Sequence, residues 1–156
     1  MTDAELLYDV ADGVARLTIN RPERRNALSW SLIASLRQRV GEARDDPEVR
    51  ALVLTGAGDR AFCAGADLTG MRADAGYADV HHARGELAAL FDELWSLGKP
   101  TIARVRGYCL AGGFGLALSC DLVVAADDAT FGTPEIDVGG WPHPSPAPLR
   151  RASPPT

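Results

Sequence analysis

A short apolar run followed by a glycine-containing turn occurs twice in this chain, and this repetition restricts the possible folds. The first run is Ala51–Thr55, with the turn 61–68 after it, and the second is Thr101–Arg106, followed by the turn 107–113. Between them, apolar residues recur at helical spacing from Val80 to Leu97. Strands that alternate with helices in this way predict an α/β fold rich in parallel strands.

The rest of the chain supplies further elements of the same kind. Alternating residues on both sides of Asp12-Gly13 predict a β-hairpin over 6–20. An apolar stripe predicts a helix over 27–44, which Asp45-Asp46-Pro47 ends. After the second glycine turn we expect a short helix over 113–119, a strand over 121–126 and a loop over 131–135.

Composition limits the class of protein. The chain has 156 residues, 46% of them hydrophobic and 24% charged, which is typical of one soluble domain with a packed core. No apolar run approaches the roughly 20 residues that span a bilayer, and the N-terminus lacks the features of a signal peptide. We therefore expect a cytoplasmic protein with no membrane partner. The net charge of −5 argues against a nucleic-acid partner, because phosphate binding needs a basic surface.

The cysteines Cys63, Cys109 and Cys120 form neither a CxxC pair nor an even disulfide set. Their small apolar neighbours predict buried free thiols. We accordingly expect no metal site.

A proline-rich stretch closes the sequence. Six of the ten prolines fall between Pro142 and Thr156, and no periodic apolar pattern is left there. We expect a folded core over 1–141 and a disordered or extended tail over 142–156. A truncated or frameshifted gene would produce such a tail, and sequencing the locus tests this hypothesis.

The two glycine turns together predict a site for an activated carbonyl group. Small residues let a ligand approach the main chain closely, and the second turn leads into a helix whose first N–H groups are unpaired. Two backbone N–H groups aimed at one point form an oxyanion hole. Each such donor typically contributes about 3 kcal/mol when a carbonyl becomes an oxyanion or enolate.

Several short motifs follow one another in a characteristic order. They are Asn20-Arg21-Pro22, Asn26-Ala27-Leu28, 61–68, 107–113, Cys120-Asp121 and 131–135. In this order they resemble the crotonase family, the enoyl-CoA hydratases and isomerases, over about Leu6 to Trp141, and the ordered set is more specific than any single glycine motif. The resemblance implies a crotonase-like spiral of ββα units, incomplete at the C-terminus, that binds acyl-CoA thioesters and stabilises an enolate.

The resemblance also implies roles for individual residues. The N–H groups of the oxyanion hole correspond to Ala66 and Gly112. Coenzyme A is part of the substrate, so no separate cofactor is implied. Contacts with the coenzyme A moiety are implied for Arg24, Arg25, Ala64, Ala66, Asp67, Leu68 and Thr69.

The acidic residues of the pattern separate two reactions. Hydratases of the family carry two glutamates, but here Gly115 occupies the first position and Glu135 the second. Hydration is easiest with two carboxylates that orient one water, whereas moving a double bond needs one base that removes and returns a proton. A lone Glu135 therefore resembles the isomerase arrangement, with Asp137 as a possible assistant. The resemblance also implies a trimer or a dimer of trimers, although the C-terminal helices that pack the subunits of the family together have no counterpart in this chain.

Two other interpretations compete with this one. The chain is alternatively an inactive fragment that binds acyl-CoA or a partner, because the helices that complete the family fold have no counterpart in it. The segment Gly56–Ala61 also satisfies the dinucleotide-binding pattern G-x-G-x-x-A after a strand. That pattern requires a helix directly after it, and Phe62-Cys63-Ala64-Gly65 is a poor helix start.

Overall fold

The computed structural model describes residues 4–67 and 77–134, and for residues 77–84 it describes the backbone only. Two sheets contain the strands of these segments. The five-stranded sheet has the order β1-β2-β3-β5-β7, and the three-stranded sheet the order β4-β6-β8. The helices of the described segments are the 3₁₀ turn η1 (Pro22–Arg24) and the α-helices α1 (Trp30–Asp45), α2 (Tyr77–Trp95) and α3 (Gly112–Leu118). The strands are β1 (Leu6–Ala11), β2 (Val14–Ile19), β3 (Ala51–Gly56), β4 (Ala61–Cys63), β5 (Thr101–Val105), β6 (Tyr108–Leu110), β7 (Leu122–Ala125) and β8 (Thr130–Gly132).

One ββα unit repeats along the chain. Strands β3 and β4 precede α2, strands β5 and β6 precede α3, and β7 and β8 follow as the next pair. In each pair the first strand joins the five-stranded sheet and the second joins the three-stranded sheet. Every pairing except β1 with β2 is parallel, so the α/β fold and the spiral of ββα units predicted from the sequence are confirmed.

Local chemistry fixes the N-terminal hairpin and the start of α1. Asp12 and Gly13 both have positive φ (54° and 80°), which is the conformation of a two-residue type I′ turn. Helix α1 begins three residues later than predicted, because the side chain of Ser29 caps it by accepting a hydrogen bond from Leu32 N (3.2 Å). Asn26 has a φ of 56° and lies outside the helix.

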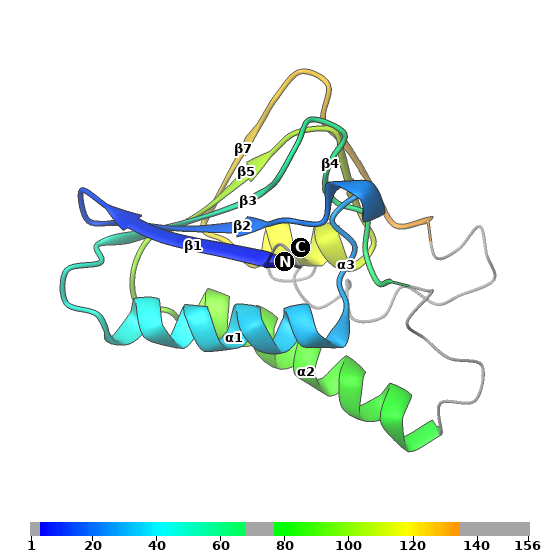
Figure 1. Cartoon of the computed structure of the whole chain (residues 1–156), viewed down its shortest axis with the longest axis horizontal. Helices are drawn as coiled ribbons and strands as arrows, with labels where there is room; N and C mark the ends of the chain where they lie inside the picture. The colour runs from blue at the N-terminus through cyan, green and yellow to red at the C-terminus, as the bar shows by residue number, and fades with distance from the viewer. Residues whose placement is uncertain (1–3, 68–76, 135–156) are drawn as a thin grey trace, which may run out of the picture.

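The core lies between the five-stranded sheet and the helices. Figure 1 shows α1 and α2 together below this sheet. Leu17, Leu54 and Ala103 form one row across strands β2, β3 and β5, and all three are fully buried. Arg37 on α1 joins the two long helices through hydrogen bonds to Glu93 and Glu86 on α2. The sheet and helix layers are therefore held by apolar packing and by an interhelical ion-pair network.

The third parallel pair differs from the prediction. Residues 131–135 were expected to form a loop, but 130–132 form strand β8, which pairs with β6. A three-residue strand is too short to show an alternating pattern, and only its pairing with β6 defines it. The two predicted glycine turns likewise begin as the short strands β4 and β6.

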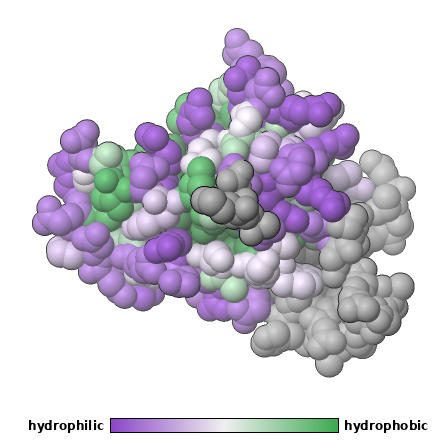
Figure 2. Space-filling view, viewed as in Figure 1, coloured by the Kyte–Doolittle hydropathy of each residue, from purple (hydrophilic) through white to green (hydrophobic). Residues whose placement is uncertain are grey.

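Strand β7 leaves apolar side chains on the surface. Val123 continues the buried row of Leu17, Leu54 and Ala103, yet it is 41% exposed. Leu122 and Val124 on the opposite face are each 59% exposed. On the face shown in Figure 2, hydrophilic residues predominate and hydrophobic ones gather in smaller areas. Within the described part of the chain, no helix is long and apolar enough to cross a membrane.

Candidate functional site

The two glycine turns meet in space. A Cβ atom added to Gly65 would lie 2.8 Å from the Cβ of Ala111 and 3.5 Å from the backbone nitrogen of Gly112. Gly65 also has a φ of +100°, which a side chain would strain. Only glycine therefore permits this approach, and it places Ala66 beside the start of α3.

Backbone hydrogen bonds fix residues 64–67, which we call the Ala66 loop. Ala64 N donates to Arg25 O (3.1 Å), Leu28 N donates to Gly65 O (2.8 Å), and Asp67 N donates to Leu28 O (2.9 Å). Leu28 and Ala66 thereby form a parallel bridge in which the groups on either side of Ala66 make the bonds. The N–H of Ala66 donates no hydrogen bond to any residue in the described segments.

Helix α3 supplies the second N–H group. Its first helical hydrogen bond runs from Gly115 N to Ala111 O (3.1 Å), so the N–H of Gly112 precedes the helical ladder. The helix start is pressed against β4, because a Cβ on Gly113 would lie 2.2 Å from the carbonyl oxygen of Cys63. This contact fixes the position of Gly112 relative to the Ala66 loop.

The residue before Gly112 has a strained backbone. Ala111 has a φ of 51° and a ψ of −124°, a combination that residues with a Cβ rarely adopt. Strain of this kind costs about 1–3 kcal/mol and concentrates at functional sites, where the surrounding structure maintains it. The outlier at the junction of the two turns supports the assignment of the site.

Ala111→Gly is expected to raise the free energy of unfolding by about 1 kcal/mol, because relief of the strain exceeds the extra chain entropy of glycine. The midpoint of urea unfolding measures this change. Ala34→Gly is the matched control, since Ala34 is exposed in the middle of α1. Glycine there is expected to lower the free energy of unfolding by about 1 kcal/mol. A lower midpoint for Ala111→Gly would contradict the inferred strain.

A buried asparagine ties the loop before α1 to strand β4. Asn26 is 0% exposed, and its Nδ2 donates to Ala57 O (3.0 Å) and to Ala61 O (2.7 Å). Its Oδ1 accepts a hydrogen bond from Arg21 N (3.0 Å). These bonds join segments that are separated in sequence, and they hold the chain before the Ala66 loop in one conformation.

The buried thiols offer no nucleophile. Cys63, Cys109 and Cys120 are free and buried, as predicted. Burial raises the pKa of Cys63 and of Cys120 to about 12 and also raises the pKa of Cys109, so all three remain protonated at neutral pH. Within residues 4–67 and 77–134, no group of three or more His, Cys, Asp and Glu side chains is arranged to hold a metal ion.

The residues predicted to contact coenzyme A fall into three groups. Arg24 and Arg25 lie in and just after η1 and are exposed, with the Arg25 guanidinium carbon 6.0 Å from the centre of the Tyr108 ring. Ala64, Ala66 and Asp67 lie together in one loop, where Asp67 forms an ion pair with Arg21 (2.7 Å). Leu68 and Thr69 lie outside the described residues, as do Glu135, Asp137 and the tail 142–156.

Sequence reasoning missed the contribution of Arg21 and Asn26 to the site. Both residues were noticed only as parts of motifs, Asn20-Arg21-Pro22 and Asn26-Ala27-Leu28. Their partners Asp67 and Ala61 lie 46 and 35 positions further along the chain. A polar residue in a loop-like segment does not indicate which distant residue it will contact, so only the structure reveals the hydrogen bonds of Arg21 and Asn26.

The dinucleotide interpretation of Gly56–Ala61 is wrong. The segment leads into strand β4, whereas a dinucleotide-binding turn opens a helix that binds the pyrophosphate. In addition, a Cβ on Gly56 would lie 2.4 Å from Phe62 O, so this glycine serves close packing of two strands.

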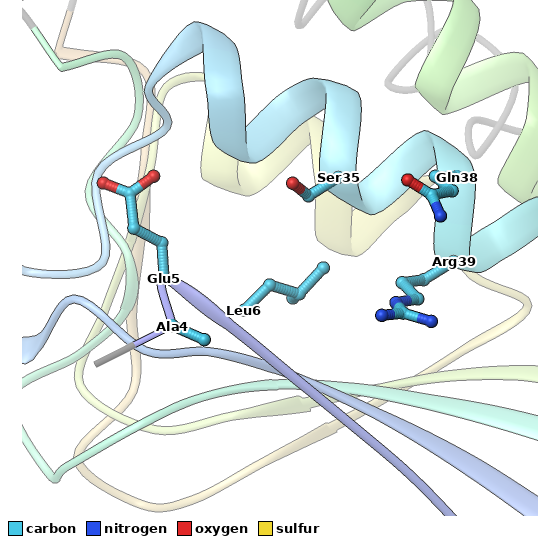
Figure 3. Close-up of a pocket in the computed structure, with 6 residues that line it drawn as sticks. All are labelled: Ala4, Glu5, Leu6, Ser35, Gln38 and Arg39. Atoms are coloured by element: carbon cyan, nitrogen blue, oxygen red, sulfur yellow. The ribbon is translucent and has the colours of Figure 1, made fainter. Parts of the chain in front are cut away.

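A separate cavity of about 360 Å³ lies between the start of β1 and helix α1, lined by Ala4, Glu5, Leu6, Ser35, Gln38 and Arg39. Figure 3 shows Ser35, Gln38 and Arg39 on the helix and Glu5 and Leu6 on the strand segment beside it. Arg39 forms an ion pair with Glu42 and lies 5.3 Å from the Tyr8 ring centre. No described residue of the two glycine turns lines this cavity, and we assign the candidate site to the turns.

Comparison with known proteins agrees with the motifs. Residues 9–146 match the family model described as enoyl-CoA hydratase/isomerase. The "Probable enoyl-CoA hydratase echA8" of Mycobacterium bovis is 40% identical over 142 residues, which are 91% of this chain and 54% of that protein. The chain therefore spans about half the length of this relative.

Solved structures show the same relation. The enoyl-CoA hydratase of Mycobacterium smegmatis superposes with a TM-score of 0.91 at 38% identity, covering 96% of this chain and 58% of that one. Pseudomonas aeruginosa AtuE superposes with a TM-score of 0.90 at 39% identity, covering 95% and 58% respectively. The chain thus corresponds to a little over half of each of these structures.

Proposed function

Because the chain belongs to the enoyl-CoA hydratase/isomerase family, we propose that it binds acyl-CoA thioesters and holds the thioester oxygen between two backbone N–H groups. The donors are those of Ala66 and Gly112. The observation that carries the proposal is the contact of the two turns, in which the Gly65 position lies against Ala111 and Gly112. Two donors fixed by the backbone need no reorganisation as negative charge develops on the oxygen.

The reaction proposed at this site is proton transfer at carbon. Polarising the thioester acidifies the proton on the neighbouring carbon, and Glu135 removes it to give an enolate. The same carboxyl group returns the proton further along the acyl chain, which moves a double bond. Gly115 on α3 has no side chain to hold a water molecule, so double-bond migration is favoured over hydration.

The coenzyme A moiety is proposed to lie along the outer side of the Ala66 loop. Exposed Arg24 and Arg25 supply positive charge for its phosphates. The moiety is proposed to contact the backbone of Ala64, Ala66 and Asp67, and then Leu68 and Thr69. No nucleic acid, membrane or separate cofactor enters this proposal.

Calorimetry with a short-chain acyl-CoA tests the binding step. We expect a measurable heat and a ligand-dependent rise in Tm, because a ligand at a hundredfold its Kd stabilises the folded state by about 2.7 kcal/mol. Coenzyme A with a free thiol is the control, since it keeps the phosphates and lacks the thioester oxygen, and it is expected to bind more weakly. NADH is expected to give no signal. Neither heat nor stabilisation with the acyl-CoA would contradict the proposal.

A second candidate function is acyl-CoA binding without turnover, in a chain that associates with other polypeptides. The exposed apolar residues Leu122, Val123 and Val124 on β7 support it, since clustered apolar surface on a sheet edge favours association. Binding in the calorimeter with no product from an unsaturated acyl-CoA distinguishes this candidate from the enzyme. Light scattering across a concentration series measures the association, whether as a trimer or otherwise.

A further inference from the structure

Arg21 contacts Asp67 in the Ala66 loop and Ala27 in the segment that pairs with this loop. Its side chain is 12% exposed. Nη2 lies 2.7 Å from Asp67 Oδ2, Nη1 donates to Ala27 O (2.6 Å), and Nε lies 2.9 Å from Glu5 Oε1. The guanidinium therefore uses all three of its nitrogens at once.

Two of these partners flank the bridge that orients Ala66. Ala27 directly precedes Leu28, whose N–H and carbonyl bond to Gly65 and Asp67. Asp67 directly follows Ala66. Arg21 thus joins the chain before Leu28 to the chain after Ala66, across the bridge between them.

We propose that Arg21 is a positioning residue, which fixes the direction of the Ala66 N–H through Ala27 and Asp67 without touching the substrate. This inference rests on the proposed function, because it assigns Arg21 to the oxyanion hole. Donors in such a site act only when held within a fraction of an ångström of the productive geometry, and small displacements cost about a hundredfold in rate.

The geometry of the contacts requires arginine. A guanidinium is planar and holds its N–H groups in a fixed fork, so it donates to the Ala27 carbonyl and the Asp67 carboxylate together. A lysine ammonium keeps the charge but is a single point, and it cannot reproduce two donors in fixed directions. Arg21→Lys therefore removes the fork and keeps the electrostatic attraction to Asp67.

Amide hydrogen exchange measured by NMR tests the positioning without any ligand. In Arg21→Lys the amides of Leu28 and Asp67 are expected to exchange about tenfold faster or more, while those of Leu52 and Leu54 in β3 stay within about twofold. Glu5→Gln is the matched control, because it removes the negative charge of the third partner of Arg21 and leaves Asp67 and Ala27 unchanged. Arg37→Lys is a second control, since it changes an ion pair between α1 and α2 in the same way.

The second measurement uses a 3-ketoacyl-CoA, whose enolate absorbs in the near ultraviolet. At saturation the enolate absorbance of Arg21→Lys is expected to fall about tenfold or more below that of the wild type. Its Kd for a saturated acyl-CoA is expected to change less than about threefold, since ground-state binding depends less on the direction of one donor. Both controls are expected to keep the wild-type absorbance.

The outcomes separate the two proposals. Unchanged exchange at Leu28 and Asp67, or an enolate absorbance at saturation equal to that of the wild type, overturns the role of Arg21. Loss of exchange protection throughout the fold, equal to that in Arg37→Lys, also overturns it, because that result describes general stability. Absence of enolate absorbance in the wild type contradicts the proposed function, and the exchange data alone then decide whether Arg21 positions the loop.

Discussion

Glu135→Gln is expected to abolish double-bond migration while acyl-CoA binding stays nearly intact. The amide keeps the size of the carboxyl group and loses the base, and a positioned base contributes about a hundredfold to ten-thousandfold in rate. A direct assay of migration with an unsaturated acyl-CoA, together with calorimetry of a saturated one, measures the two effects separately. We expect kcat to fall by this factor and Kd to change little.

Glu48→Gln is the control for this substitution, because Glu48 is an exposed carboxylate in the turn after α1. It is expected to leave both quantities unchanged. Each preparation is also assayed for water addition, which is expected to be the slower reaction. Robust hydration that survives in Glu135→Gln would show that the base lies elsewhere, and Asp137 would be the next candidate.

Ala66→Pro is expected to lower kcat/KM by about a hundredfold or more, since proline has no N–H and removes one of the two donors. Ala66→Ser is its control, because Ala66 is exposed and serine keeps the backbone donor. Circular dichroism and urea unfolding of both variants show whether the loop change remains local.

Gly112 gives an independent version of the same test. A Cβ at this position would lie 3.4 Å from Leu87 Cδ2 and 3.6 Å from Leu28 Cδ1, which is ordinary contact, so Gly112→Ala is expected to fold. Gly112→Val adds two further methyl groups to that Cβ and is expected to lose activity as Ala66→Pro does, by excluding the thioester. Wild-type kcat/KM in both Ala66→Pro and Gly112→Val would remove the oxyanion-hole assignment.

The sequence predicted the repeating architecture because its signals are local. The turn at Asp12-Gly13 and the buried run of β3 both follow from residues close together in the chain. Strand β8 was missed because its identity depends on pairing with β6, some twenty positions earlier. The start of α1 was misplaced because Leu28 continues the apolar stripe, whereas the Ser29 cap decides where the helix begins.

The approach of the two glycine turns was predicted from local signals of the same kind. Gly65 and Gly112 marked positions where another group approaches the main chain closely, and the structure shows that the two glycines approach each other. The support behind them was not predictable, because Arg21 and Asp67 meet only in the folded chain. The exposure of β7 was likewise hidden, since an apolar strand looks the same in sequence whether or not another element covers it.

The N–H groups of Ala66 and Gly112 are proposed to donate together to the thioester oxygen. Infrared difference spectroscopy of an acyl-CoA labelled with ¹³C at the thioester carbonyl tests this most directly. The carbonyl stretch of the bound ligand is expected to lie at lower wavenumber than in water, because two fixed donors polarise the bond more strongly than solvent does. The shift is expected to be smaller in Ala66→Pro. A bound ligand whose carbonyl stretch lies at or above its value in water would contradict donation by the two N–H groups.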